Sequence, residues 1–222
     1  MARHIFDLKH IFRREIQMAY VCYYPATGRY LKGFDLPGWG ERYDAGRIPK
    51  DVPSVFHTGQ RRLELSEAPE KVLLKKQAAS LPDIFSARSG VRIISERVRQ
   101  ILEAFDPGVH QILPIEAFYR DGSKPDTAYF FLNVTKHLDT VIDEASSVKM
   151  AFQIVGEKSR DQMELDPPTA RNLVIRKDRA AEHNLWREKR YPYLPLLMSD
   201  EMHAEFKAQK IKAYHFWRAE ER

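Results

Sequence analysis

Two stretches of this 222-residue chain share one internal order: VRIISERVRQILEAFDPGVHQILPI at residues 91–115 and LPLLMSDEMHAEFKAQKIKAYHFWR at residues 194–218. In each, a short apolar run ends at a serine, an amphipathic segment follows, and a second apolar run closes the unit. Ser95 precedes its returning run by 14 residues, and Ser199 precedes its own by 12. The pattern predicts strand, helix and strand twice, either as a duplication or as two ordinary segments that are alike by chance.

The first unit contains the strongest predicted helix. Ser95 is suited to cap its start, because a serine hydroxyl can accept a hydrogen bond from an otherwise unpaired backbone N–H. The Asp-Pro-Gly triplet at residues 106–108 ends it, since proline has no N–H and glycine can take a left-handed turn. One face is apolar at the i, i+3, i+4 and i+7 positions, which are Val98, Ile101, Leu102 and Phe105.

The second unit predicts a shorter helix after Ser199. Acidic residues stand in its first turn and lysines in its last, which is the order that the helix dipole favours. Its apolar face is thinner, with Met202 and Phe206 spaced i, i+4.

The remaining pattern predicts an α+β fold with a mixed, mostly antiparallel sheet on which these two short amphipathic helices pack. Residues 25–53 read as loops, and residues 54–69, which are polar and have no clear period, as an excursion or hinge. We therefore expect a strand and loop-rich lobe at 1–69 and an α+β domain at 70–222, together forming one compact unit. Other strands are expected at 19–24, 71–76, 109–119, 128–134, 148–155, 172–178 and 211–217.

Composition places the chain among ordinary globular proteins, with 43% apolar and 30% charged residues. Cys22 is the single cysteine and stands between apolar neighbours, which suits burial in a reducing compartment. Charged residues interrupt the N-terminal segment, so no signal peptide is expected, and no apolar run reaches the roughly 18 residues of a membrane span. We expect a cytoplasmic protein.

The sequence contains no recognisable catalytic or metal-binding motif. Its eight histidines are scattered, without HExxH spacing, and GxSxG, GxxxxGKS and GxGxxG are absent. His110, which alternates with apolar neighbours, is interpreted as structural. We therefore predict no enzyme, no catalytic residue, no metal and no cofactor.

Charge is distributed in two opposed segments within a net charge of +5. Residues 171–190 carry seven bases against three acids, and residues 139–166 carry seven acids against three bases. The segment HNLWREKRYPYLP at 183–195 interleaves aromatic and basic residues, which is typical of interface hot spots and of nucleic-acid contacts, although such aromatics can also be core. The candidate partner-binding residues are Arg176, Lys177, Trp186, Arg187, Arg190, Tyr191, Asp139, Asp143 and Glu144.

Several short motifs stand out along the chain. They are Leu81, Pro82, Asp83 and Phe85; Ile94, Ser95, Glu96 and Arg97; Asp106, Pro107, Gly108, Val109, His110, Gln111 and Pro114; an arginine-bearing strand at Leu185 to Arg187; and Ser199, Asp200 and Glu201. In these motifs the chain resembles a bacterial family of polymorphic-toxin immunity proteins, immunity family eleven, over about residues 70–218. The tail departs from the family pattern at Met202, where leucine is usual, and near Lys212 and Ala213, where the family has a glycine.

The resemblance implies a cytosolic inhibitor that binds the catalytic domain of a secreted toxin encoded by a neighbouring gene. A basic toxin such as a nuclease would suit the acidic segment, and an acidic toxin would suit the basic aromatic one, which the net charge slightly favours. Two other hypotheses stay open: a nucleic-acid-binding module that uses Arg176, Lys177, Arg187 and Arg190 on phosphates, and an uncharacterised enzyme. Sheet edges also allow a homodimer.

Overall fold

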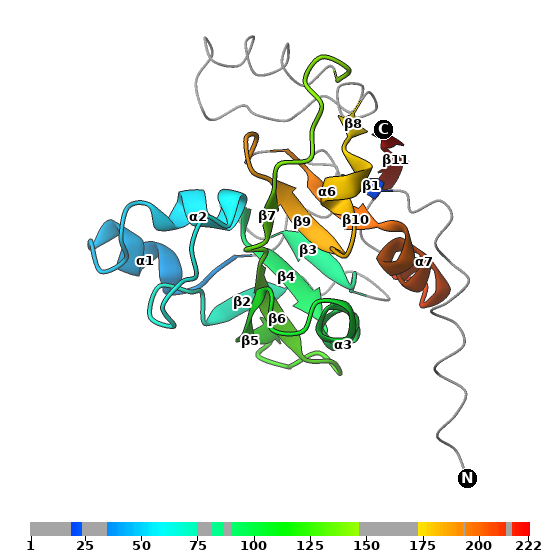
Figure 1. Ribbon diagram of the computed structural model, residues 1–222. Coiled ribbons are helices and arrows are strands. Elements are labelled where there is room, and N and C mark those ends of the chain that lie inside the picture. Colours follow the sequence, from blue (N-terminus) through cyan, green and yellow to red (C-terminus); the bar gives the residue numbers. More distant parts are fainter. Residues whose placement is uncertain are drawn as a thin grey trace.

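The computed structural model describes residues 19–23, 35–74, 81–86, 90–146, 173–192, 194–211 and 215–222. Six of its nine strand pairs are antiparallel and three are parallel, so the predicted α+β class with mixed, mostly antiparallel sheets is confirmed (Figure 1). The expected strand at 148–155 lies outside the described residues.

The strands of the described residues form two five-stranded sheets and one short pair. The first sheet has the order β11-β1-β10-β9-β7, with β1 at Ala19–Tyr23, β7 at His137–Leu138, β9 at Leu185–Glu188, β10 at Leu196–Ser199 and β11 at His215–Arg218. The second has the order β2-β5-β6-β4-β3, with β2 at Lys71–Leu74, β3 at Ile84–Ser86, β4 at Arg92–Ser95, β5 at Gln111–Tyr119 and β6 at Tyr129–Asn133. The pair joins β8 (Val174–Ile175) to β12 (Glu220–Glu221).

The two serine-containing units have one topology. In the second sheet, β4 continues into helix α3 (Glu96–Phe105) and then β5, and β4 and β5 flank β6. In the first sheet, β10 continues into helix α7 (Asp200–Ala208) and then β11, and β10 and β11 flank β1. Because the flanking strands are antiparallel to the central strand in both sheets, each unit is a split β-α-β module.

The same backbone and hydroxyl contacts anchor both serines. The N–H of Ser95 donates to the carbonyl of Asp83 at 2.7 Å, and the N–H of Ser199 donates to that of Asn184 at 2.8 Å. Each hydroxyl also bonds the side chain of the same residue, at 2.9 Å for Ser95 and 3.0 Å for Ser199. Asp83 and Asn184 each precede the strand next to the serine-bearing one, so the two units are structurally equivalent at this corner.

The two capping predictions have different outcomes. Ser199 caps α7 as expected, because its hydroxyl oxygen accepts from the Met202 N–H at 3.2 Å. Ser95 makes no such side-chain bond to α3, because its hydroxyl is directed to the Asp83 carboxylate instead. The helix still begins at Glu96, so here the strand-to-helix corner is fixed by Asp83.

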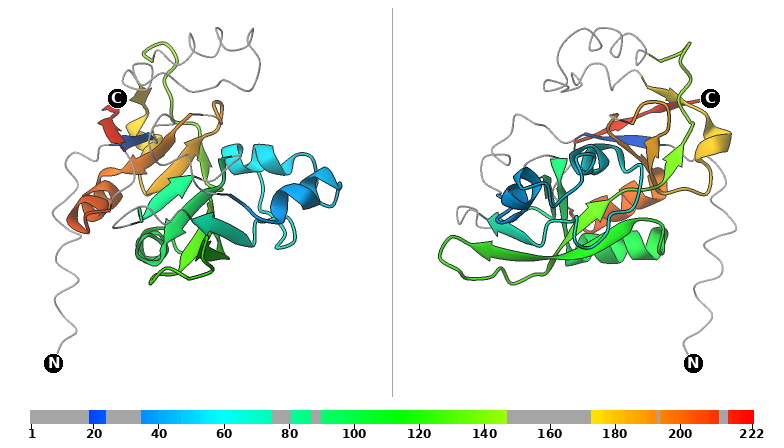
Figure 2. Two further views of the ribbon diagram at one scale, coloured as in Figure 1. Left: turned by 180° about the vertical axis from the view of Figure 1, so that it is seen from behind. Right: turned by 90° about the vertical axis from the view of Figure 1, so that its left-hand side faces the viewer.

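Side chains from the two sheets and the two helices form a shared core. One face of each sheet contributes apolar residues, such as Leu196 and Ile94, which pack with Met202 of α7 and Leu102 of α3. α3 and α7 lie next to each other on this side (Figure 2). Cys22 is buried in the same core, as expected, and burial raises the pKa of its thiol.

The opposite faces of the sheets are covered separately. Helices α1 (Trp39–Asp44) and α2 (Val52–Thr58) cover the second sheet, where Trp39 and Phe56 pack with Phe131. These helices correct the expectation of loops at 25–53 and an excursion at 54–69. Residues on both sides of position 69 therefore share one core, and the domain boundary proposed there stays a prediction, as does the homodimer through edges β11, β7, β2 or β3.

Arg187 of β9 ties this helical cover to the sheets. Its side chain is 2% exposed and donates to three backbone carbonyls: Val134 from Nε at 2.9 Å, Phe56 at 3.3 Å, and His57. Phe56 and His57 belong to the end of α2, where the helix dipole favours a cation. Gly59, at a φ of 64°, allows this approach, since a Cβ there would overlap the Val134 carbonyl.

Replacing Arg187 should therefore destabilise the protein. In Arg187→Met the carbonyls lose their donor while remaining buried, and we expect the free energy of unfolding to fall by about 3 kcal/mol. Urea unfolding followed by circular dichroism measures this. The exposed Arg176→Met is the matched control and should change stability by less than about 0.5 kcal/mol. Equal stability of Arg187→Met and the wild type would contradict the role assigned to this side chain.

Candidate functional site

Several predicted partner-binding residues meet in one ion-pair cluster, made of Asp139, Asp143, Arg179, Arg190 and Tyr191. Arg190 bridges the two carboxylates, with Nε 2.7 Å from Asp139 and a terminal nitrogen 2.6 Å from Asp143. Arg179 pairs with Asp139 at 3.2 Å, and the Tyr191 hydroxyl donates to Asp143 at 2.8 Å. Burial and the Asp143 carboxylate raise the pKa of Tyr191, so this hydroxyl keeps its proton.

This cluster unites two segments that the sequence presents as alternative surfaces. The acidic residues come from the chain after β7, and the basic and aromatic ones from α6 (Lys177–Ala180) and from the chain just after β9. Arg190 is exposed, and its guanidinium also lies 5.4 Å from the Tyr191 ring centroid. Exposed ion pairs contribute at most about 1 kcal/mol each to stability, so the cluster mainly presents positioned charges at the surface.

The other predicted residues divide into exposed and buried. Arg176, Lys177 and Glu144 are exposed. Trp186 and Arg187 are 1% and 2% exposed, because Trp186 packs in the core beneath the first sheet and Arg187 binds the backbone of α2. These two side chains therefore act within the fold in this structure. Residues 147–166 of the acidic segment lie outside the described residues.

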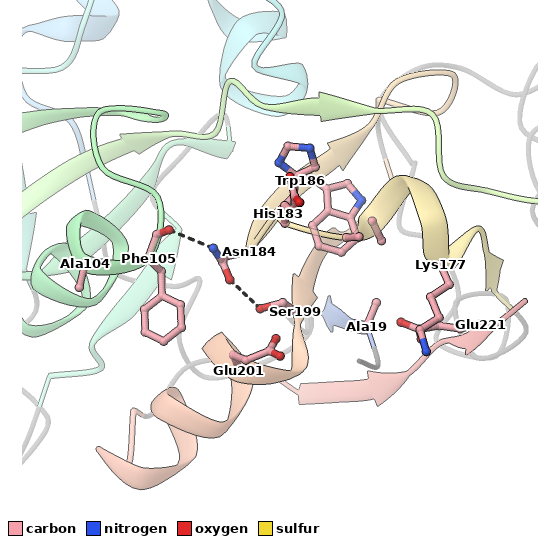
Figure 3. A pocket seen from close by; sticks show the side chains of 13 residues that line it. Ala19, Ala104, Phe105, Lys177, His183, Asn184, Trp186, Ser199, Glu201 and Glu221 are labelled. Atoms are coloured by element: carbon pink, nitrogen blue, oxygen red, sulfur yellow. Dashed lines mark hydrogen bonds between the residues drawn. The ribbon is translucent and has the colours of Figure 1, made fainter. Parts of the chain in front are cut away.

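A pocket of about 560 Å³ lies beside the cluster, where the end of α3 meets the start of α7 (Figure 3). Helix α6 and the turn after it form one wall, and β12 forms another. The half-buried Phe105 supplies aromatic surface, the buried Trp186 lies behind the wall, and alanines from α3, α6 and β1 line the remaining space. α6 connects the two features, since it contributes Lys177 and Ala180 to the pocket and Arg179 to the ion-pair cluster.

Two neutral polar side chains that line the pocket, Asn184 and Ser199, make hydrogen bonds within the protein. The Asn184 amide donates to the Phe105 carbonyl at 2.9 Å and its oxygen accepts from the Ser199 hydroxyl, as the dashed lines of Figure 3 show. The same hydroxyl caps α7. These groups join the end of α3 to the start of α7, and neither is directed at a histidine base.

The charged groups around the pocket are mostly acidic. Glu182, Glu201 and Glu221 line it, against Lys177. Burial lowers the pKa of His183, which keeps this ring neutral near pH 7, and burial raises the pKa of Glu221. Among the described residues that line the pocket, glutamates therefore outnumber lysines. Sequence reasoning missed these residues, although the alignment of Ser95 with Ser199 was the signal that could have found Glu201.

Asp106 fixes this corner from behind the pocket. Its carboxylate is buried and accepts from the N–H of Leu185 at 2.9 Å, from Asn184 at 3.1 Å and from the His110 ring at 3.3 Å. The motif around residues 106–111 thus has a structural role: it attaches the end of α3 to the beginning of β9. The interpretation of His110 as a structural residue agrees with this arrangement.

The sequence matches the immunity protein family Imm11 over residues 27–221. The chain belongs to this family. The match crosses residue 69 and includes α1 and α2. The family match therefore covers more of this immunity protein than residues 70–218, where the motifs lie. No curated protein matches the sequence.

Within the described residues of the immunity protein, no group of three or more histidine, cysteine, aspartate or glutamate side chains is placed to hold a metal ion. No helix there combines the length and the apolar character needed to cross a membrane.

The stability of the protein should depend on pH through the ionisation of Asp106. Burial alone would raise its pKa, but hydrogen bonds from His110, Asn184 and Leu185 outweigh burial and lower it. A carboxyl with a lowered folded-state pKa stabilises the protein above its unfolded pKa, about 3.9, and loses this contribution as pH falls through the folded value.

Asp106→Asn should therefore reduce the free energy of unfolding at pH 7 by about 1 to 3 kcal/mol, because an amide donor replaces one of two accepting oxygens. The difference in the free energy of unfolding between Asp106→Asn and the wild type should narrow below about pH 4, where the wild-type carboxyl begins to protonate. Urea unfolding between pH 7 and pH 3 measures both, with the exposed Asp44→Asn as control. A difference that widens on acidification would contradict this account.

Proposed function

We propose that this immunity protein neutralises a cognate secreted toxin by forming a complex with the toxin's catalytic domain. The toxin is encoded by a neighbouring gene, and the complex forms in the cytosol without a cofactor or any catalysis by the immunity protein. The observation that carries the proposal is the family match over residues 27–221. An inhibitor of this kind needs shape and charge complementarity at a surface and no reactive constellation.

The ion-pair cluster and α6 are the proposed contact surface. Arginine and tyrosine are enriched among residues that dominate binding energy, and both stand here on short, well-connected segments. Arg190 is held by Asp139, Asp143 and the Val141 carbonyl, so little side-chain freedom remains to be lost on binding. Exposed Arg176, Lys177 and Glu144 extend the surface with both signs of charge.

The same contacts disfavour the nucleic-acid-binding alternative. Of its four phosphate-binding candidates, Arg187 is buried and Arg190 already bridges two carboxylates. Phosphate groups would approach a surface that also presents Asp139 and Asp143, and like charges repel.

The enzyme alternative predicts a pocket with converging reactive groups. A pocket is present, but the Ser199 hydroxyl donates to Asn184 and caps α7, where an activated serine would instead donate to a general base. The favoured role of the pocket is therefore binding.

Toxin binding by an Arg190→Ala variant tests the proposed surface. Co-expression with the product of the neighbouring gene should restore growth for the wild type, and calorimetry should detect the complex. Arg190→Ala should weaken that complex by at least about 30-fold, or about 2 kcal/mol, as hot-spot residues do. Arg47→Ala, an exposed arginine beyond α1, should change the dissociation constant by less than twofold.

Two results would overturn parts of the proposal. If the neighbouring product is not toxic, or forms no complex with the wild-type protein, the immunity function fails. If Arg190→Ala binds as tightly as the wild type, the function stands and the contact surface lies elsewhere.

A further inference from the structure

The described helices end in two different ways. Three of them are followed by a glycine with a positive φ: Gly46 after α1 at 70°, Gly59 after α2 at 64° and Gly108 after α3 at 68°. The chain after α6 and α7 takes the same left-handed conformation at Glu182, with a φ of 69°, and at Lys210, with a φ of 54°. In the described part of the chain, these two are the residues other than glycine that have a positive φ.

The left-handed conformation strains both of these residues. It brings the Cβ atom of an L-residue close to the following carbonyl oxygen, and glycine avoids this contact because it has no Cβ. A glycine at either position would therefore relieve strain. The side chains of Glu182 and Lys210 are thus present at a cost in stability, so each needs a compensating interaction.

Lys210 has such an interaction within the fold, and Glu182 has the wrong charge for it. Each lies two residues beyond its helix, near the negative end of the helix dipole. A cation is favoured there, as at Lys210, whereas the dipole of the short α6 disfavours the Glu182 carboxylate. Glu182 is exposed and makes no hydrogen bond or ion pair with another described residue. Burial lowers the pKa of the adjacent His183, so this ring does not neutralise the carboxylate near pH 7.

Glu182 lies where the proposed contact surface meets the pocket. It follows Arg179 of the ion-pair cluster by three residues, and it lines the pocket beside α6. The turn that carries it is held on both sides. The His183 N–H donates to the Ala180 carbonyl at 3.2 Å, and the Asn184 side chain ties the next part of the turn to the end of α3. The carboxylate is therefore presented from a backbone that has little freedom to lose on binding.

We infer that Glu182 is a recognition residue whose carboxylate binds a lysine or arginine side chain of the cognate toxin, an inference that rests on the proposed function. A strained residue without a compensating contact in the free protein is expected where the contribution of its side chain comes from the complex. A cation from the partner would also offset the repulsion between this carboxylate and the end of α6. The toxin surface opposite α6 is therefore basic at this point.

Replacing Glu182 should make the protein more stable and a weaker inhibitor. Glu182→Gly removes the strain and the carboxylate together. It should raise the urea midpoint of unfolding by about 0.3 M and weaken the complex with the toxin catalytic domain by at least about 10-fold, measured by calorimetry. Glu182→Gln keeps the length of the side chain and removes only the charge. It should weaken the complex to a similar extent and leave the midpoint within about 0.1 M of the wild type.

Two controls make the same changes elsewhere. Lys210→Gly makes the same backbone change after α7, at the end of that helix far from the pocket, and Glu41→Gln makes the same charge change at an exposed site on α1. Both should bind the toxin catalytic domain within twofold of the wild type, because neither changes the carboxylate beside α6.

The outcomes separate this inference from the proposed function. If the wild type binds the toxin and both Glu182 variants bind within twofold of it, Glu182 is not a recognition residue and the immunity function stands. A urea midpoint that falls in Glu182→Gly would mean that this side chain serves the fold, which would also overturn the inference. If the product of the neighbouring gene does not bind the wild type, the proposed function fails and the role of Glu182 fails with it.

Discussion

Strand β9 buries two side chains of opposite charge, Arg187 and Glu188. The arrangement of the segments around β9 depends on the hydrogen bonds that these two side chains make. Arg187 binds carbonyls of α2 and Val134, while the adjacent Glu188, fully buried, accepts from the N–H groups of Thr140 and Val141 and from the Thr140 hydroxyl. Because successive residues of a strand point to opposite faces, one dipeptide fixes the helical cover on one side and the chain after β7 on the other. That segment also carries Asp139 and Asp143, so the buried contacts of Glu188 fix the position of the ion-pair cluster at the surface. A buried charge without such partners would cost several kcal/mol, which leaves few alternative placements for β9.

The two modules are equivalent in the contacts that hold their serine corners. Both have a serine bonded to an Asp or Asn before the adjacent strand, and both place this corner against the end of the other module's helix. The first corner is closed by an internal ion pair between Arg97 and Asp83. The second has Glu201 in place of Arg97, and the pocket beside it adjoins the exposed ion-pair cluster through α6. The same arrangement of backbone contacts therefore carries residues of opposite charge at its two corners.

The sequence predicted the parts of the fold that local pattern determines. The helix at Glu96–Phe105 follows from its apolar face, and α7 from its serine and its charge order, while α1 and α2 were missed because helices of six or seven residues owe their stability to packing of side chains such as Trp39 and Phe56. The site was predicted less well. Arg187 belongs to a charged segment and reads as exposed, and only the contact with carbonyls about 130 residues earlier buries it. Asp139 and Arg190 were assigned to rival surfaces because a contact between residues 51 positions apart leaves no local signal.

Hydrogen exchange of the immunity protein, measured by mass spectrometry with and without the toxin catalytic domain, tests the central claim most directly: that recognition occurs at α6, the ion-pair cluster and the pocket beside them. We predict slower exchange on binding in residues 139–146, 176–184 and 189–191, and unchanged exchange in α1 and α2. Protection confined to α1, α2 or an edge strand such as β2, with no change around α6, would contradict it.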